Sequence, residues 1–577
     1  MSNMKWRDII KRNQELGDAM SEPIKRIALL GNVTVLHLKE TLELELREEG
    51  LSAEIVVGNY DSIVQDSERY SSCDAVLIFW EAGNLVDGFH DRYNLFSEIE
   101  LNALTARVEG EIQLTLQHLA LTPLVLINRF SSKVFDSNVL RRSKLSELCN
   151  RLNSTLEDIK TSNQIIVDID TVIAQTGLKN AVDFRHFLSA KSLYSREFCS
   201  NYARLVKPAF LAASGYVRKV LVLDCDNTLW GGVLGEDGES QLEMSESSLK
   251  GKAFQEVQYI AKGLKKNGIL LALCSKNNQS DVDHVIDEHP DMTLRNEDFV
   301  AKKVNWKDKA TNLIELAKEL NLGLDSFVFV DDSEFEIGLI KKALPEVRAI
   351  LVPKNISEYP ELMRSLQGEF FSLSRSEEDR NKTFMYQVEQ ERIEDAHKFS
   401  SIDDYLSSLE LNLSVLWDDE VPVPRAAQMT QKTNQFNLCT RRYTESDIER
   451  MLMDDTMCIA VFGLSDRYGD YGITGMCITS IDIPDEKVAS IDTFLMSCRV
   501  IGRNVEYIFF DQLIKRLKDK EIDRLEAEFI STPKNKQVER FYDGLGLKCI
   551  GSQKNSRQYE LRLSEYESRQ IDYILVN

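Results

Sequence analysis

Short apolar runs alternate with amphipathic stretches along the first third of the chain. The stretch 36–50 spaces its leucines at helical intervals and ends at Gly50, and residues 85–118 form a second helical connection. The apolar runs predict strands at 24–31, 53–58, 75–80, 122–130 and 164–170. Because strands that alternate with helices form parallel sheets, we predict a parallel α/β domain over residues 1–194.

A second series of the same kind follows a predicted helical connector at residues 195–215. Its helical stretches are 254–268, 311–322 and 337–347. Its apolar runs predict strands at 220–224, 269–276, 326–332 and 348–353. We therefore predict a second parallel α/β domain over residues 216–370.

The remaining residues, 371–577, show a different pattern. A charged segment at 376–398 is predicted to be helical, and an amphipathic stretch at 504–519 predicts a second helix. Three apolar runs between them predict strands at 457–464, 472–483 and 488–497. Since strands outnumber helices here, we predict an α+β domain.

The composition excludes several classes of partner. The chain has 577 residues and a formal net charge of −23, which argues against nucleic acid or an anionic membrane surface as its main partner. We find no apolar run of membrane-spanning length and no secretory signal. The ten cysteines form neither C-x-x-C pairs nor zinc-type clusters, so we expect free thiols and a cytoplasmic protein. The oligomeric state stays open.

The strongest chemical signal lies at the ends of the strands of the second series. Asp224 and Asp226 follow the first strand, Ser275 ends the second, and Asp331 and Asp332 end a third. Lys309 opens a helix after residues 305–308. The carboxyl ends of parallel strands share one edge of a sheet, so we expect these side chains to converge there.

These residue types suit phosphoryl transfer. Clustered carboxylates repel one another unless a cation neutralises them, and an all-oxygen set suits Mg²⁺. One carboxylate can attack phosphorus, and the second can transfer the proton. A hydroxyl and a lysine can stabilise the transferring phosphoryl group.

Together the motifs resemble those of the haloacid dehalogenase (HAD) phosphatase superfamily. The motif D-x-D-x-T covers residues 224–228 and is followed by Ser275, Lys309 and the 331–332 aspartate pair. The resemblance implies a Rossmann-like domain without a large cap, with Asp224 as nucleophile and Asp226 as general acid/base. It implies Mg²⁺ ligands at Asp224, the Asp226 backbone carbonyl and Asp331, with Asp332 nearby.

Further candidate residues surround these motifs. Asn227 and Thr228 lie within the first motif, and Asn277 follows Ser275 by two residues. Lys307 competes with Lys309 for the role of the lysine, and we favour Lys309 because the family pattern is N-W-x-x-K. The loop 230–238 contains several glycines, which would allow it to act as a small flap.

Longer stretches narrow the resemblance. Residues 224–238, 431–449, 466–475 and 495–506 resemble FkbH-like proteins, placed in HAD subfamily IIIC. This resemblance implies polyketide-type biosynthesis, in which a glyceryl-like phosphorylated acyl substrate loses phosphate and is loaded on an acyl carrier protein. The alternatives are a stand-alone phosphatase on soluble phosphate esters and a non-catalytic scaffold that docks a carrier protein.

The C-terminal domain resembles GNAT acyltransferases. Arg499, Gly502 and Asn504 match a motif whose backbone amides cradle a pyrophosphate, although the family has Gly or Ala where this chain has Asn504. The ligand implied is CoA or the phosphopantetheine arm of a carrier protein, and a structural remnant is the alternative. Asn535 and Tyr542 match the closing segment of that family.

Three cysteines are candidates for carrying an acyl group. Cys498 precedes Arg499, where a cation and a helix N-terminus favour the thiolate, so it is our candidate for an acyl tether. Cys439 lies in the 431–449 stretch. Cys225 should point away from its neighbouring aspartates because side chains alternate along a strand.

The N-terminal domain resembles the SGNH hydrolase fold. Asp183 and His186 form its D-x-x-H motif, but the turn after the first strand, residues 31–34, contains no serine. An Asp/His pair without a nucleophile has nothing to activate, and we do not expect Thr34 to replace the serine. We therefore predict a docking or structural module.

Overall fold

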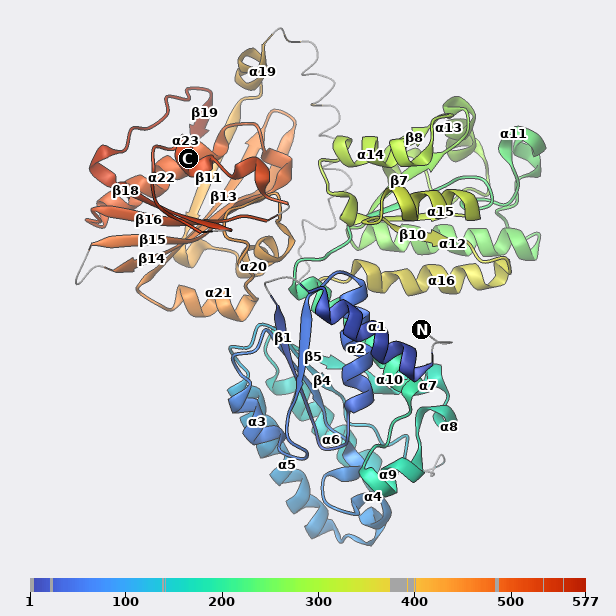
Figure 1. The fold of residues 1–577 in the computed structure, drawn as a ribbon. Coiled ribbons are helices and arrows are strands. Elements are labelled where there is room, and N and C mark those ends of the chain that lie inside the picture. The colour runs from blue at the N-terminus through green and yellow to red at the C-terminus, as the bar shows by residue number, and fades with distance from the viewer. Residues whose placement is uncertain are drawn as a thin grey trace. The chain divides into compact units, whose positions relative to one another are not determined.

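The computed structural model describes residues 5–20, 24–136, 140, 142–373, 392, 399, 401–482, 487–532, 534–553 and 555–577. The predicted helix at 376–398 lies outside these residues, apart from Arg392. The chain has the predicted mixed α/β multidomain fold (Figure 1). It divides into two compact units, residues 1–214 with 443–447 and residues 215–442 with 448–577.

The first unit contains a five-stranded parallel sheet in the order β2-β1-β3-β4-β5. The strands are β1 (Lys25–Gly31), β2 (Ala53–Val57), β3 (Ala75–Phe79), β4 (Val125–Asn128) and β5 (Gln164–Val167). The helices are α1 (Trp6–Asp18), α2 (Leu36–Glu48), α3 (Ile63–Arg69), α4 (Phe89–Arg92), α5 (Glu98–His118), α6 (Lys144–Ile159), α7 (Ile169–Thr176), α8 (Leu178–Ala181), α9 (Phe184–Ala190) and α10 (Arg196–Ala213). All five strands match predicted apolar runs.

The predicted connector at 195–215 is helix α10, and this helix packs within the first unit. Lys207 on α10 forms ion pairs with Glu45 and Glu49 of α2, at 3.1 and 2.9 Å. Tyr202, also on α10, is buried against Phe79 at the end of β3. The connector is thus an integral part of this α/β layer.

The second unit begins with another five-stranded parallel sheet, in the order β10-β9-β6-β7-β8. The strands are β6 (Val220–Leu223), β7 (Leu270–Ser275), β8 (Phe299–Val304), β9 (Phe327–Asp331) and β10 (Arg348–Leu351). The helices are α11 (Leu234–Asp237), α12 (Leu249–Lys266), α13 (Gln279–Glu288), α14 (Lys309–Glu319), α15 (Glu334–Ala343) and α16 (Tyr359–Ser365). Strand β8 was not predicted, because two lysines interrupt its apolar pattern.

Alternate residues of the central strand β6 point to opposite faces of this sheet. Leu221 and Leu223 enter a core with α12, α13 and α16, whereas Val220 and Val222 enter a core with α14 and α15. Both faces are therefore covered. The short gaps between the motifs hold only α11, a 3-10 turn and α12 before β7, and α14 and another 3-10 turn before β9, with no inserted domain.

The rest of the second unit forms a nine-stranded, mainly antiparallel sheet. Its order is β17-β18-β16-β15-β14-β13-β11-β19, with β12 pairing with β15. The strands are β11 (Leu411–Trp417), β12 (Phe436–Asn437), β13 (Met457–Asp466), β14 (Gly469–Asp482), β15 (Val488–Met496), β16 (Arg524–Ile530), β17 (Lys548–Ser552), β18 (Ser556–Arg562) and β19 (Ile574–Val576). The helices are α19 (Ile402–Ser408), α20 (Val423–Lys432), α21 (Glu445–Leu452), α22 (Val505–Asp519) and α23 (Phe541–Gly544).

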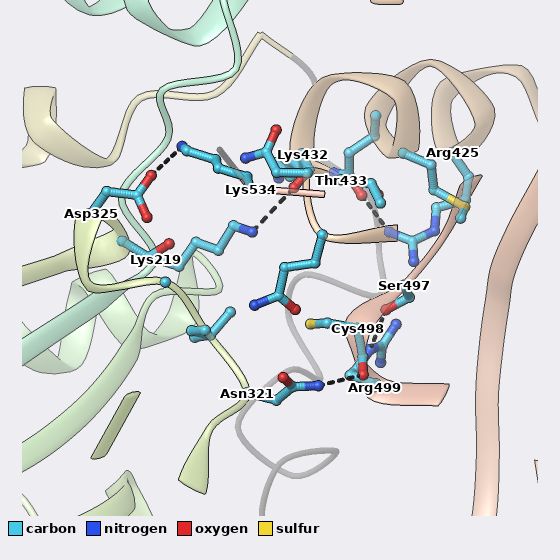
Figure 2. A pocket seen from close by; sticks show the side chains of 17 residues that line it. Lys219, Asn321, Asp325, Arg425, Lys432, Thr433, Ser497, Cys498, Arg499 and Lys534 are labelled. Carbon is cyan, nitrogen blue, oxygen red and sulfur yellow. Dashed lines mark hydrogen bonds and ion pairs between the residues drawn. The ribbon is translucent and has the colours of Figure 1, made fainter. Parts of the chain in front are cut away.

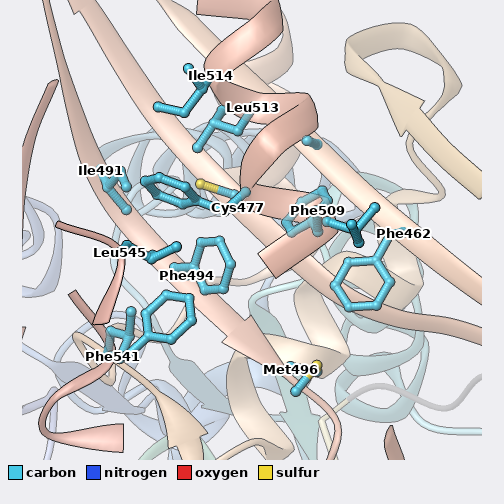
Figure 3. Close-up of a cluster of buried hydrophobic side chains, with 14 of the residues drawn as sticks. Phe462, Cys477, Ile491, Phe494, Met496, Phe509, Leu513, Ile514, Phe541 and Leu545 are labelled. Carbon is cyan, nitrogen blue, oxygen red and sulfur yellow. The ribbon is translucent and has the colours of Figure 1, made fainter. Parts of the chain in front are cut away.

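Helix α22 covers this sheet through a cluster of aromatic side chains. Phe509 of α22 packs against Phe462 and Phe494, with ring centroids 4.6 and 5.6 Å apart (Figure 3). Phe541 of α23 contacts Phe494 at 5.2 Å. The amphipathic stretch predicted as a helix thus buries its apolar face on the sheet.

Strands β15 and β16 are parallel neighbours that separate along their length. They pair only over residues 488–491 and 524–527. Beyond that point β12 fills the opening: it pairs with the end of β15, and Leu438 accepts a hydrogen bond from the Ile530 amide. Residues of the 431–449 stretch therefore bridge β15 and β16 where these two strands separate.

Across the described part of the chain, no helix combines the length and the apolar character needed to cross a membrane.

We predict that Asn535→Ala destabilises the second unit. Asn535 is fully buried, donates to the backbone oxygens of Asn437 and Ile530 at 2.9 Å, and accepts from the Thr532 amide. Its loss leaves buried backbone groups without partners, which costs about 2–3 kcal/mol. Urea unfolding should show a lower midpoint for Asn535→Ala, and the exposed control Asn94→Ala should match the wild type.

Candidate functional site

The ends of three adjacent strands carry the main candidate residues. Asp224 follows β6, Ser275 ends β7, and Asp331 ends β9. Strand β6 lies between β7 and β9, so these tips meet at the carboxyl edge where the strand order reverses. The structure thus brings together side chains that are more than one hundred positions apart in the sequence.

Lys309 lies between two of these carboxylates. Its Nζ is 3.0 Å from Asp224 Oδ2 and 2.5 Å from Asp331 Oδ2. All three side chains are buried, and the two carboxylates raise the pKa of Lys309 although burial alone would lower it. The rival Lys307 is exposed and pairs with Glu315 at 2.9 Å. Of the two lysines, Lys309 alone contacts the carboxylates.

Burial changes the acidity of the carboxylates at this edge. The pKa of Asp224 is raised mainly by burial, while Lys309 opposes the rise and Asp331 adds to it. The pKa of the exposed Asp332 is also raised, first by desolvation and then by Asp331. Both pKa shifts thus come mainly from removal of the carboxylates from water, and the neighbouring Asp331 adds to them.

This donor set fits a divalent cation. Asp224, Asp331 and Asp332 each offer an oxygen within 4.8 Å of the others, and Lys309 forms ion pairs with two of them, Asp224 and Asp331. At a separation of about 4 Å and an effective dielectric constant of about 20, two like charges repel by about 4 kcal/mol. A hard cation that prefers oxygen ligands, such as Mg²⁺, would relieve this repulsion.

The side chain of Asp226 is held by three N–H donors. Its Oδ1 accepts from the indole Nε1 of Trp230 and the amide of Leu234, both at 3.0 Å. Its Oδ2 accepts from Asn277 Nδ2 at 2.9 Å. The role of Trp230 was missed in the sequence, although the tryptophan four residues after Asp226 was a usable signal.

The first part of the loop after Asp226 is anchored by hydrogen bonds and packing. Asn227 adopts a positive φ of 50° and accepts from the Gly232 amide at 3.1 Å. Gly231 lies against Phe254, where a Cβ atom would come within 2.9 Å of the ring. Gly231 therefore allows the loop to pack closely against α12.

The remaining predicted residues of this motif set line the same edge. Ser275 is buried and accepts from Asn277 at 3.3 Å, and its hydroxyl moderates the burial-driven rise of the Asp224 pKa. Thr228 is fully buried, and its hydroxyl has no hydrogen-bond partner among the described residues. Cys225 points into the apolar core below the edge, as alternation along the strand predicts.

The GNAT-like residues lie on the other sheet of this unit, before α22. Gly502 and Asn504 both adopt positive φ angles, of 87° and 64°, at the turn into the helix. Asn504 donates to the Tyr573 hydroxyl at 2.7 Å, and Arg499 donates to Ser497 at 3.3 Å. At the position where GNAT acyltransferases have Gly or Ala, this chain thus has the larger Asn504, whose side chain is hydrogen-bonded to Tyr573.

The cysteines differ in accessibility. Eight of the ten are buried, Cys498 is half-buried and Cys549 is exposed. Burial raises the pKa of Cys439 to about 12, and its sulfur contacts the Glu528 carbonyl oxygen. Of the three cysteines considered as acyl tethers, Cys498 is the most accessible.

In the first unit, the D-x-x-H pair serves the start of α9. Asp183 accepts from the Arg185 amide at 3.0 Å, and the Arg185 guanidinium lowers the pKa of Asp183 to about 2. His186 is exposed and lies 3.4 Å from the same carboxylate. Thr34 donates to the Ala190 carbonyl oxygen at 2.6 Å.

Asn32 occupies the end of β1 and is fully buried. Its amide group donates to the backbone oxygens of Glu81 and Asn84, and it accepts from the Glu81 amide. Its side chain is thus engaged in fixing the loop after β3.

We predict that Lys309→Met destabilises the metal-free protein by about 3 kcal/mol, because it leaves buried carboxylates without their cation. The loss should be greater at pH 8 than at pH 5, since protonation of Asp224, whose pKa burial raises, relieves the repulsion at low pH. Urea unfolding in a chelator at both pH values checks this. The matched control Lys307→Met should stay within about 0.5 kcal/mol of the wild type, and equal stabilities for the two variants would refute the assignment.

Comparison with known proteins finds similarity in structure only. No known family description and no curated protein matches the chain. Among solved structures, the N-terminal part of BF1531 from Bacteroides fragilis, which contains a phosphatase domain complexed with Mg, is 24% identical. The match covers 64% of this chain and 100% of that one, with a TM-score of 0.56, and shows that the fold is shared.

Two acetyltransferases are also found. The ribosomal-protein-S18-alanine N-acetyltransferase of Escherichia coli is 13% identical, with coverage of 28% of this chain and 97% of that one and a TM-score of 0.21. PaiA N-acetyltransferase from Thermoplasma acidophilum, in complex with coenzyme A, is 13% identical, with coverage of 21% and 72% and a TM-score of 0.18.

Proposed function

We propose that the chain is a Mg²⁺-dependent phosphatase of HAD type, with its active site at the carboxyl edge of the β10-β9-β6-β7-β8 sheet. The observation that carries this proposal is the buried Lys309 between Asp224 and Asp331, with Asp332 and Ser275 beside them. In this proposal the phosphatase domain spans residues 216–370, residues 195–215 lead into it from a domain of residues 1–194, and residues 371–577 form a third domain after it.

Asp224 is the proposed nucleophile. One of its carboxylate oxygens attacks the phosphorus atom, the bond to the leaving oxygen breaks, and an aspartyl-phosphate forms. Asp226 gives its proton to the leaving oxygen and then takes one from the water that hydrolyses the aspartyl-phosphate. Trp230, Leu234 and Asn277 hold Asp226 in a fixed orientation during both proton transfers.

Lys309 and Ser275 complete the proposed phosphoryl site. Lys309 offers a fixed positive charge, and Ser275 a hydroxyl, to the oxygens of the transferring group. Asp224 and Asp331, with Asp332, would hold Mg²⁺, which would screen the anionic nucleophile from the anionic phosphate. The phosphatase domain of the structurally similar BF1531 fragment is likewise complexed with Mg.

We predict that Asp224→Asn abolishes phosphate release while leaving the fold intact. Loss of a covalent nucleophile should lower kcat at least about 1,000-fold. Release of phosphate from a generic phosphate ester with Mg²⁺ measures this, and circular dichroism checks the fold. The exposed control Asp291→Asn should keep wild-type activity. Normal turnover by Asp224→Asn, or wild-type activity that survives chelation, would refute the mechanism.

The finer proposal is an FkbH-type reaction. It rests on the sequence stretches outside the phosphatase motifs and on the absence of an inserted cap domain between them in the described residues 216–370. Without a cap domain, the site is open to a reaction partner as large as a carrier protein. The substrate would be a small phosphorylated acyl compound, and the acceptor would be the phosphopantetheine thiol of an acyl carrier protein.

Transfer and hydrolysis can be separated in one experiment. Incubation of the protein with 1,3-bisphosphoglycerate, with and without a carrier protein, should give an acyl adduct on the carrier, detected by intact mass, together with free phosphate. Free phosphate without an adduct would favour the stand-alone phosphatase. Neither product, with no hydrolysis of any phosphate ester, would favour the non-catalytic scaffold. Cys498→Ala tests whether an adduct also forms on the enzyme.

A further inference from the structure

Residues 499–504 join the end of β15 to the start of α22, so a ligand held by this motif would have two neighbours. One is the amino end of α22, where backbone amides attract a phosphate. The other is the opening between β15 and β16, which begins where these strands stop pairing, after Ile491 and Ala527. An extended arm could bind in such an opening by pairing with the backbone of the strand edges. Whether CoA or a carrier arm fits therefore depends on what the chain itself places there.

The chain's own residues 436–439 fill the opening. All four are buried, and strand β12 pairs with the end of β15. The Leu438 amide donates to the Phe494 carbonyl oxygen at 3.1 Å, and the Leu438 carbonyl oxygen accepts from the Ile530 amide at 2.8 Å. Because each backbone amide donates once, the groups that an extended arm would need on β15 and β16 are already used within the chain.

Side chains hold this segment in place. Asn535 donates to the backbone oxygen of Asn437 at 2.9 Å, and the Cys439 thiol donates to the backbone oxygen of Glu528 in β16 at 3.0 Å. Phe436 is part of the apolar core of the sheet. A ligand that displaced β12 would have to break these contacts and expose apolar side chains to water, which is unfavourable.

The amino end of α22 carries a negative charge of its own. Glu506 lies in the first turn of this helix and is 7% exposed, and its Oε2 atom is buried without a hydrogen-bond partner among the described residues. Burial raises the pKa of Glu506, while its own backbone amide and Arg569 oppose the rise. The carboxylate thus lies at the end of the helix where the helix dipole stabilises a negative charge. A pyrophosphate at the same place would be repelled by it.

The segment between β18 and β19 contacts the same end of α22. Asn504 donates to the hydroxyl of Tyr573 in this segment at 2.7 Å. Three residues further along the helix, Tyr507 stacks with Arg569 of the same segment, whose guanidinium carbon lies 3.7 Å from the centre of the ring. Side chains three residues apart lie on one face of a helix, so the segment follows that face of α22.

Residues 497–499, which lead into the motif, are also engaged within the chain. They line a cavity of about 310 Å³ between α20 and the amino edge of the parallel sheet (Figure 2). The backbone oxygen of Cys498 accepts from Asn321 at 2.8 Å. The cations that line the cavity all have partners within the chain: Lys219, Arg425, Lys432, Arg499 and Lys534. Their charges are therefore already used there.

We infer that the chain itself occupies the place where the GNAT resemblance puts CoA or a carrier arm. Residues 436–439 take the backbone groups of the opening, and Glu506 supplies the negative charge at the start of α22. The C-terminal domain is therefore a structural domain that transfers no acyl group from CoA. A carrier arm that takes part in the reaction proposed above binds elsewhere on the chain. The inference is independent of the phosphatase activity, because it concerns the other sheet of the second unit.

Hydrogen exchange of the full chain tests this inference, with mass spectrometry of peptides that cover residues 436–439 and 500–508. In a chelator, CoA, acetyl-CoA and inorganic pyrophosphate should leave the exchange of both peptides unchanged in the wild type. A ligand bound at the motif, present at about twice its Kd, would slow exchange at 500–508 about threefold. An arm that displaced β12 would speed exchange at 436–439. Either change, caused by any of the three compounds, would overturn the inference.

Removal of the chain's own groups should open the motif to an anion. In Asn504→Gly/Glu506→Gln, pyrophosphate should slow exchange at 500–508 about threefold, because the carboxylate and the side chain bonded to Tyr573 are gone. Glu506→Gln alone, which keeps the Asn504 contact, should show a smaller effect in the same direction. The exposed control Asp519→Asn, at the other end of α22, should respond like the wild type. The 436–439 peptide reports in the same experiment that each variant is folded. Unchanged exchange at 500–508 in both Glu506 variants would refute the role given to Glu506.

Discussion

Two buried carboxylates and one buried ammonium group form the interaction on which the candidate active site depends. Asp224 and Asp331 end neighbouring strands, and Lys309 reaches both from the start of α14. Burial strengthens the attraction, but it also makes the excess negative charge costly, because water does not screen it. The site therefore contains one fixed cation, Lys309, and a set of carboxylate oxygens that suits a metal cation. Both cations would offset the negative charge of a phosphate ester.

Asp226, the second carboxylate of the D-x-D motif, is held in place by hydrogen bonds from N–H groups. The chain turns back after Asp226, so that Trp230 and Leu234 donate to it, and Asn277 from the loop after β7 completes the set. The glycines of this loop provide the turn and make room for Phe254. Trp230 thus contacts Asp226 directly, and the two glycines after it allow the turn that brings the Leu234 amide back to the same carboxylate.

The two edges of the parallel sheet in the second unit differ in the charged side chains near them. The carboxyl edge of the parallel sheet gathers carboxylates, and the cavity at its amino edge gathers cations. Strand β12 fills the opening between β15 and β16, so the 431–449 stretch shapes one cavity wall while it completes the sheet.

The sequence by itself determined the parallel α/β series, because buried strands read as continuous apolar runs and end where polar motifs begin. It also identified Asp224, Ser275, Lys309 and Asp331 as candidate site residues, because the carboxyl ends of parallel strands lie at one edge of a sheet. It did not predict β8, whose lysines break the apolar pattern, or β12, which is two residues long. Only the tertiary structure decided that Lys309 rather than Lys307 contacts the carboxylates, and that Trp230 holds Asp226. Only the tertiary structure assembled the cationic cavity, because its residues come from five separate stretches between 219 and 534 and share no local pattern.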